Sequence, residues 1–203
     1  MDKQREHNDL YQSLFEYYGK SVKLTRDDTA FIVSLFKPIH LKRRAFLVVP
    51  GDVCQNHFIV KGGLKLYLED ENARQHCQHF GFEQWWMGDM NSFLNQEPSR
   101  LHIQALEPTT VLQITLEDQH RLLEAIPALN TLYRQLVEKA LSRANQRILD
   151  TISSCAEDRY EDFLATYPSY VERITNQDIA SYIGVTPEFF SKMKRDYWKK
   201  ASQ

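Results

Sequence analysis

The chain lacks the long apolar segments that mark membrane and secreted proteins. No run approaches the roughly 20 apolar residues that span a bilayer. The N-terminal segment MDKQREHNDL has no apolar core of the kind that a secretion signal carries. Cysteine is scarce too, because Cys54, Cys77 and Cys155 form an odd set without CxxC spacing. The sequence therefore predicts no disulfide framework, no membrane association and a reducing, cytoplasmic location.

Catalytic signatures are also missing. The sequence contains no GxGxxG, GxxxxGK[ST], HExxH or GxSxG motif, and its acidic residues form no pair that could act as acid and base. We therefore expect neither an enzyme nor a bound metal or cofactor. The net charge of −2 also excludes a general basic field that would attract nucleic acid.

The most informative stretch present is ITNQDIASYIGVTPEFFSKMKR, from Ile174 to Arg195, which predicts two short helices joined by a tight turn. Thr175 or Asn176 can cap the first helix, and Gly184 suits the left-handed position at its end. Thr186 can then cap the second helix. These residues have the spacing of a DNA-binding helix-turn-helix, with an ordinary helical hairpin as the alternative.

The polar face of the second helix is the predicted DNA contact. From Lys192 onward the chain carries five Lys or Arg residues and one Asp, a local basic end suited to phosphate contacts. Phe189 can contact a thymine methyl group or pack inward. The residues that we expect to contact DNA are Gln177, Thr186, Pro187, Glu188, Ser191, Lys192, Arg195 and Lys199.

The middle of the chain, from Ile39 to about Thr115, has the pattern of short strands and turns. Apolar runs alternate with glycine, proline and polar turns at regular spacing, which suggests a small antiparallel barrel or jelly roll. Helices are expected before it, over residues 8–18 and from Thr25 to Pro38. The fold class predicted is therefore α+β, an antiparallel β-roll with flanking helices.

A long helix is expected next, ending near Ser153. Its apolar stripe includes Leu129, Leu132, Leu136 and Ala140, and a stripe this wide can pack on its own roll and on a twin helix. We predict a dimer interface at these four residues, with packing wholly within one chain as the alternative. The expected domains are residues 1–116 (helices and roll), 117–150 (dimerisation helices) and 151–203 (helix-turn-helix).

The order of roll, long helix and helix-turn-helix resembles the Crp–Fnr family of bacterial regulators over residues about 30–197. The segments that carry the resemblance are AFLVVPGDVCQNHFIVKGGLKLY, WMGDMNSFLNQEPSRLHIQALEPTTVLQIT and ITNQDIASYIGVTPEFFSKMKR. FEQWW, PSRL and AEDRYEDFLATYP look like its Bacteroidetes-type branch. The resemblance implies a cyclic-nucleotide-binding-type roll, a winged-helix-like DNA-binding domain, a homodimer on double-stranded DNA, a small-molecule effector and RNA polymerase as a further partner.

The effector pocket of this family matches only in part. Where the family binds cyclic AMP, a Gly-Glu pair and an Arg-Ser pair hold the nucleotide. Gly88 matches here, but Asp89 replaces Glu, Ser99 stands at the Arg position and Arg100 at the Ser position. A shift by one residue on a strand turns a side chain to the opposite face. We therefore expect Arg100 to point away and cyclic AMP not to be the effector, unless a local bulge turns Arg100 inward.

Two further features leave alternatives open. Trp85 and Trp86 can line a pocket for another ligand or pack in the core. His76, Cys77 and His79 stand where haem-sensing relatives take ligands, although two ligands on one strand face do not enclose a haem. The leading function is a sequence-specific, homodimeric transcription regulator. The alternative is a ligand-sensing or protein-interaction module whose helix-turn-helix is only structural and has no specific DNA target.

Overall fold

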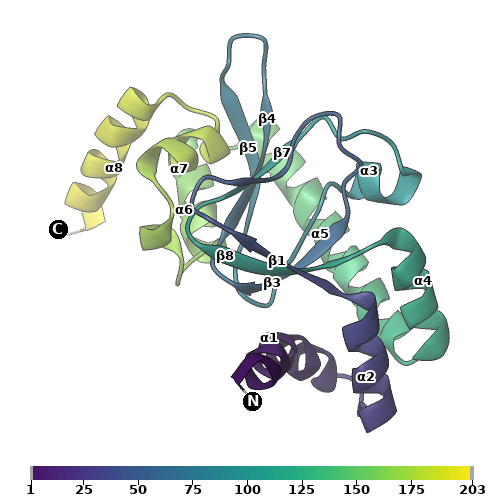
Figure 1. Ribbon diagram of the computed structural model, residues 1–203. Helices are drawn as coiled ribbons and strands as arrows, with labels where there is room; N and C mark the ends of the chain where they lie inside the picture. The colour runs from purple at the N-terminus through teal and green to yellow at the C-terminus, as the bar shows by residue number, and fades with distance from the viewer. Residues whose placement is uncertain (1, 202–203) are drawn as a thin grey trace. The chain divides into compact units, whose positions relative to one another are not determined.

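The computed structural model describes the backbone of residues 2–201 and the side chains of residues 10–199. The elements follow one another as expected, with helices at both ends and strands between (Figure 1). The first part contains α1 (Asp2–Gly19), α2 (Arg26–Leu35), β1 (Lys37–Leu41), β2 (Phe46–Val48), β3 (Asn56–Lys61), β4 (Leu64–Glu69), β5 (Gln75–Gly81) and β6 (Trp86–Met87). The second contains α3 (Met90–Asn95), β7 (His102–Ala105), β8 (Thr109–Ile114), α4 (Leu116–Ala125), α5 (Leu129–Ser153), α6 (Ala156–Thr166), the short 3₁₀ helix η1 (Val171–Arg173), α7 (Asn176–Ile183) and α8 (Pro187–Ala201).

The strands form two four-stranded sheets, in the orders β1-β8-β3-β6 and β2-β7-β4-β5. In the first sheet β8 pairs antiparallel with both β1 and β3, and in the second β2 pairs antiparallel with β7. This arrangement confirms the predicted antiparallel roll with flanking helices. No helix in the described part of the chain is long and apolar enough to cross a membrane.

By its contacts the chain divides into two compact units. The first comprises the chain up to Leu66 together with Phe80–Val137, and the second comprises Tyr67–His79 together with the chain from Glu138 on. The division differs from the three predicted domains, because the end of the β4–β5 hairpin and most of α5 group with the C-terminal helices. The boundaries expected at residues 116 and 150 therefore stay a prediction.

Strand alternation explains how the first unit is packed. Phe58 of β3 lies opposite Leu112 of β8, and the next pair is Ile59 with Val111. Because successive side chains of a strand point to opposite faces, the two pairs serve different cores. Phe58 and Leu112 pack with the flanking helices, whereas Ile59 and Val111 belong to the cluster that also holds Leu64. Both faces of these central strands are thus buried.

His57, on the same central strand, is a buried titratable group. Its side chain is 1% exposed. Its Nδ1 lies 3.2 Å from the carbonyl oxygen of Met87, and its Nε2 lies 3.2 Å from Oε1 of Gln113. Burial lowers the pKa of His57 from 6.5 to about 4, although both hydrogen bonds act in the opposite direction. The folded roll therefore keeps this imidazole neutral at a pH where the unfolded chain protonates it.

This pKa predicts how stability depends on pH. Below its ordinary pKa of 6.5 the unfolded chain binds a proton that the folded roll excludes until about pH 4. Acidification through this window therefore lowers the free energy of unfolding, by at most about 3 kcal/mol for one such group. We expect His57→Gln to reduce this dependence in urea titrations, with His120→Gln, at an exposed histidine of α4, as the control that should keep the wild-type slope. Equal slopes for all three proteins would contradict the assignment.

Candidate functional site

The first helix of the helix-turn-helix, α7, begins and ends as the sequence predicts. Thr175 is the N-cap: its Oγ1 accepts a hydrogen bond of 3.1 Å from the backbone N–H of Asp178 and donates one of 2.6 Å to the Asp178 carboxylate. Gly184 ends the helix with φ of 76°, and its N–H donates to the carbonyl of Ala180. A side chain with a Cβ would be strained at that left-handed position, so glycine sets the turn.

The second helix, α8, is held from its inner face. Phe190 is completely buried and Met193 is 5% exposed, together with Ile179 and Ile183 of α7. The ring of Phe190 meets Tyr160 of α6 edge to face, with centroids 5.2 Å apart. An apolar face this well covered fixes the rotation of α8 about its own axis, and hence which residues face outward.

The outer face of the helix-turn-helix carries the predicted DNA contacts. All of them are exposed: Gln177, Thr186, Pro187, Glu188, Ser191, Lys192, Arg195 and Lys199. Thr186 also accepts a hydrogen bond from the backbone of Phe189, and Ser191 donates to the carbonyl of Pro187, so their hydroxyl groups are partly engaged within the helix. Phe189 is 52% exposed. It therefore lies on the outer face rather than packing inward.

Two basic residues that the sequence analysis missed brace this unit. Lys194 donates a hydrogen bond of 2.9 Å to the side chain of Asn176, which ties the middle of α8 to the start of α7. Arg159 of α6 donates to the carbonyl of Ile183 at 2.8 Å and to that of Ser154 at 2.6 Å. Both carbonyls lie at helix ends, where such groups lack a partner within the helix. A basic residue outside a capping motif carries no sequence signal for this role.

The segment predicted to hold an effector, which includes Asp89 and Ser99, is joined by its own hydrogen bonds. Asp89 is the N-cap of α3, and its Oδ1 accepts from the backbone N–H groups of Asn91 and Ser92 at 3.1 and 3.4 Å. Its Oδ2 accepts from the Ser99 hydroxyl at 2.8 Å. Ser99 Oγ in turn accepts from the N–H of Leu101 at 3.0 Å. Ser99 is 3% exposed, so this bond is shielded from water.

Ser99 and Arg100 lie in the loop before β7, which begins at His102, so the strand-face argument does not apply to them directly. The Arg100 side chain is exposed, whereas that of Ser99 is buried. Gly88 fits because a Cβ there would approach the carbonyl oxygen of Gln55 to 3.1 Å. The cassette thus presents the partly buried carboxylate of Asp89, rather than a guanidinium, at the N-terminus of α3.

Trp86 belongs to the core. Its ring contacts Phe58 with a centroid distance of 5.4 Å, Tyr133 at 5.8 Å and Phe36 at 6.2 Å. Of the two alternatives for this residue, core packing is therefore the one found. The candidate haem ligands form no cluster: among the described residues no group of three His, Cys, Asp or Glu side chains could hold a metal ion.

On the long helix α5, one of the residues predicted at the dimer interface, Leu129, lies elsewhere. Leu129 is completely buried in the chain's own core, and Leu132 packs against the same cluster. Leu129 was expected at a dimer interface, and it is unavailable for one. Leu136 is partly buried and Ala140 exposed. The start of the predicted stripe thus packs on the roll, one of the two destinations that its width allows.

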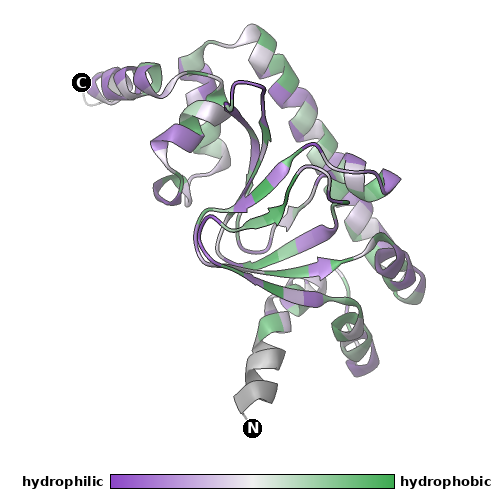
Figure 2. Cartoon of the chain, turned by 45° about the horizontal axis from the view of Figure 1, so that its top comes forward, coloured by the Kyte–Doolittle hydropathy of each residue, from purple (hydrophilic) through white to green (hydrophobic). Residues whose placement is uncertain are grey.

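A second apolar stripe on α5 is exposed. Since a helix turns by about 100° per residue, its members lie on one face: Val137, Leu141, Ala144, Ile148 and Ile152. The four large ones are between 56% and 78% exposed. Figure 2 shows hydrophobic residues recurring along this helix. They are spaced by three or four residues, the spacing of a coiled-coil seam.

Comparisons with known proteins agree with this geometry. Residues 38–125 match the cyclic nucleotide-binding domain family. A comparison with curated protein sequences finds no match. Among solved structures, the c-di-GMP-responsive global regulator CLP of Xanthomonas campestris is similar, with 14% identity and a TM-score of 0.70 over 87% of this chain and 93% of that one.

Two further solved structures are similar in fold. FixK2 from Bradyrhizobium japonicum shares 14% identity with a TM-score of 0.70, over 82% of this chain and 86% of its own. A protein from Eubacterium rectale assigned to the crp/fnr family of transcriptional regulators shares 17% identity with a TM-score of 0.66, over 87% and 85%. The chain therefore shares the fold of these three solved structures, and its residues 38–125 match the cyclic nucleotide-binding domain family.

Proposed function

We propose that this protein is a sequence-specific transcription regulator of Crp–Fnr type that binds double-stranded DNA as a homodimer. One observation carries the proposal: the inner face of the helix-turn-helix is fully buried while every predicted DNA contact is exposed. A helix-turn-helix with only a structural role has no need of an outer face rich in groups that bind bases and phosphates. RNA polymerase would be a further partner, as the family resemblance implies.

The side chains of α8 divide into two roles. Glu188 and Lys192 lie four residues apart on the exposed face, and in the major groove they would reach base edges. Phe189 beside them offers an apolar contact for a thymine methyl group. Lys199, further along the helix, would meet phosphate and contribute affinity without sequence preference. Two such helices related by a twofold axis would read half-sites about 34 Å apart.

Substitutions at base-contacting and phosphate-contacting residues should have different effects on DNA binding. We expect Lys192→Ala and Glu188→Ala each to change the preferred base at one position, with about 1–3 kcal/mol of lost discrimination. Lys199→Ala should weaken binding equally on all sequences and reduce its salt dependence. Fluorescence anisotropy on a set of single-base operator variants measures both effects. Lys23→Ala, at an exposed lysine outside the helix-turn-helix, is the charge-matched control. An unchanged preference in Lys192→Ala would place the reading face elsewhere.

The exposed stripe of α5 supports the homodimer. A second copy of the same helix would cover Leu141, Ile148 and Ile152, which are otherwise 58–78% exposed to water. Burial of large apolar side chains is favourable by about 25 cal/mol per Å², and the heptad-like spacing suits knobs-into-holes packing. The proposed dimer seam therefore lies on a different face of α5 from Leu129.

A charge in this seam should separate the subunits. Leu141→Glu would bring two carboxylates together in an apolar contact, where an unpaired charge is strongly disfavoured. We expect monomers in sedimentation equilibrium and loss of binding to paired half-sites. Gln135→Glu adds the same charge at an exposed position on the opposite side of α5 and should remain dimeric. A dimeric Leu141→Glu protein would mean that another surface forms the interface.

We further propose that the effector pocket does not bind cyclic AMP. A cyclic phosphate entering the cassette would meet the carboxylate of Asp89, which is already held by Asn91, Ser92 and Ser99. Two anions would repel, and the guanidinium of Arg100, which is exposed, is not placed to neutralise them. We expect the effector to be another small molecule.

Calorimetry tests this directly. We expect no heat of binding for cyclic AMP or cyclic GMP up to about 1 mM, which corresponds to less than about 4 kcal/mol of binding free energy. Micromolar binding that Arg100→Ala abolishes would show that the loop can rearrange and bring Arg100 inward. The proposal would then be wrong.

A further inference from the structure

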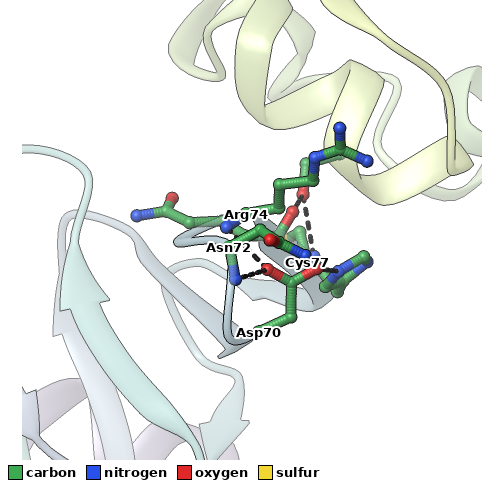
Figure 3. Close-up of polar contacts among 7 residues, drawn as sticks. Asp70, Asn72, Arg74 and Cys77 are labelled. Atoms are coloured by element: carbon green, nitrogen blue, oxygen red, sulfur yellow. Dashed lines mark hydrogen bonds and ion pairs between the residues drawn. The ribbon is translucent and has the colours of Figure 1, made fainter.

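The end of the β4–β5 hairpin is a tightly built turn within the second unit. The Asp70 carboxylate accepts hydrogen bonds from the backbone N–H groups of Asn72 and Arg74, at 2.9 and 3.0 Å, and from the His76 ring at 2.9 Å (Figure 3). The His76 contact and the backbone bonds lower the pKa of Asp70, so this carboxylate is charged at neutral pH. The turn is therefore ordered by its own contacts.

The strand that follows this turn bonds to the first helix of the helix-turn-helix. Ser181 of α7 accepts a hydrogen bond of 2.9 Å from the N–H of Cys77, and its hydroxyl donates to the carbonyl of Gln75. Both partners are backbone groups of β5, and β5 is the last strand in its sheet. One side chain of α7 thus satisfies two groups of an edge that otherwise lacks a strand partner. In Figure 3 the helix lies directly against this edge.

Arg147 of α5 adds a second connection between the same two elements. Its Nη2 donates to the carbonyl of Cys77 at 2.8 Å and to that of Tyr182 at 2.9 Å. Its guanidinium also lies over the Tyr182 ring, 3.9 Å from the centroid. The Tyr182 carbonyl is in the last turn of α7, where helical carbonyls lack partners and a cation is favourable. Arg147 therefore joins β5 and α7 by hydrogen bonds, stacking and charge.

A third contact lies on the same strand. The Tyr167 hydroxyl, at the end of α6, lies 3.3 Å from Nδ1 of His79. Burial, together with the charges of Arg143 and Arg147, lowers the pKa of His79 to about 4. The imidazole is thus neutral at physiological pH and can accept this hydrogen bond.

These contacts leave the reading face open. Ser181 and Tyr182 face the hairpin, whereas Gln177 and the outer face of α8 remain exposed. The hairpin therefore does not compete with DNA for the predicted contacts. Since α8 packs on α7 through Ile179, Ile183 and Phe190, holding α7 also holds the reading helix.

We propose that Ser181 and Arg147 are positioning residues for DNA binding, which fix α7 to the β4–β5 hairpin and so hold α8 in one orientation. The inference rests on the proposed function, because orientation matters only if α8 reads DNA. Its physical basis is entropic. Two recognition helices must meet two half-sites together, and a helix that wobbles loses freedom on binding that a fixed helix has already given up.

The test compares Ser181→Ala with Ser181→Thr, which keeps the hydroxyl, and with Arg147→Lys, which keeps the charge but not the planar fork. Ser153→Ala is the matched control, because the hydroxyl of this exposed serine donates to the carbonyl of Leu149 in its own helix. Two readouts are measured on the intact protein: backbone hydrogen exchange across β5 and α7, and affinity for DNA with one or two half-sites.

For Ser181→Ala and Arg147→Lys we expect exchange to be about tenfold faster at Cys77 and throughout α7. Affinity for two half-sites should fall about tenfold, and that for a single half-site by much less. Ser181→Thr and Ser153→Ala should match the wild type. Faster exchange confined to Cys77, or DNA binding unchanged or tighter in Ser181→Ala, would overturn the positioning role. A wild-type protein that binds no DNA would instead refute the proposed function, with the exchange data still showing whether the hairpin holds α7.

Discussion

The burial of Phe190 is the contact on which the helix-turn-helix depends. This ring is fully enclosed between α7 and Tyr160 of α6, and it leaves α8 a single rotation about its axis. Given that rotation, Glu188 and Lys192 face outward together. Arg159 then bonds to the carbonyl at the end of α7, and Lys194 joins α8 to the start of α7. The polar outer face is thus a consequence of the apolar packing on the other side of the same helix.

The effector cassette shows the opposite use of polar groups. In the roll, one carboxylate oxygen of Asp89 accepts hydrogen bonds at the N-terminus of α3, and the other accepts one from Ser99. A carboxylate at a helix N-terminus takes the place that a bound anion would otherwise occupy. On our proposal, residues 38–125 keep the fold of the cyclic nucleotide-binding domain family that they match, while Asp89 occupies the place of the phosphate. Regulation of this protein would therefore need different ligand chemistry, or none.

Much of the fold was predictable because the signals are local. Thr175, Gly184 and Thr186 mark the ends of two helices through capping and a left-handed turn, and each sits where expected. Strand alternation likewise predicts the roll. Ser99 and Arg100 do differ in burial, but they precede β7 and lie outside any strand, so the two-residue period of a strand does not account for it.

Other features depend on contacts between distant residues, which no local pattern reports. The stripe on α5 was assigned to a dimer interface as one set, although Leu129 lies in the roll's core. A leucine is equally suited to a dimer interface and to the core of the roll, so sequence alone could not separate these two locations. Ser181 and Arg147 were also missed, since their partners are backbone groups of β5, about 70 or more positions away.

The central claim is that an outward polar face on α8 reads DNA in a twofold-related pair. Selection of binding sites from random double-stranded DNA by the intact protein tests it most directly. The account predicts enrichment of one inverted repeat, with half-site centres about 10 base pairs, or one helical turn, apart. Enrichment of no sequence, at a salt concentration near physiological, would contradict it and leave a sensing or interaction module with a structural helix-turn-helix.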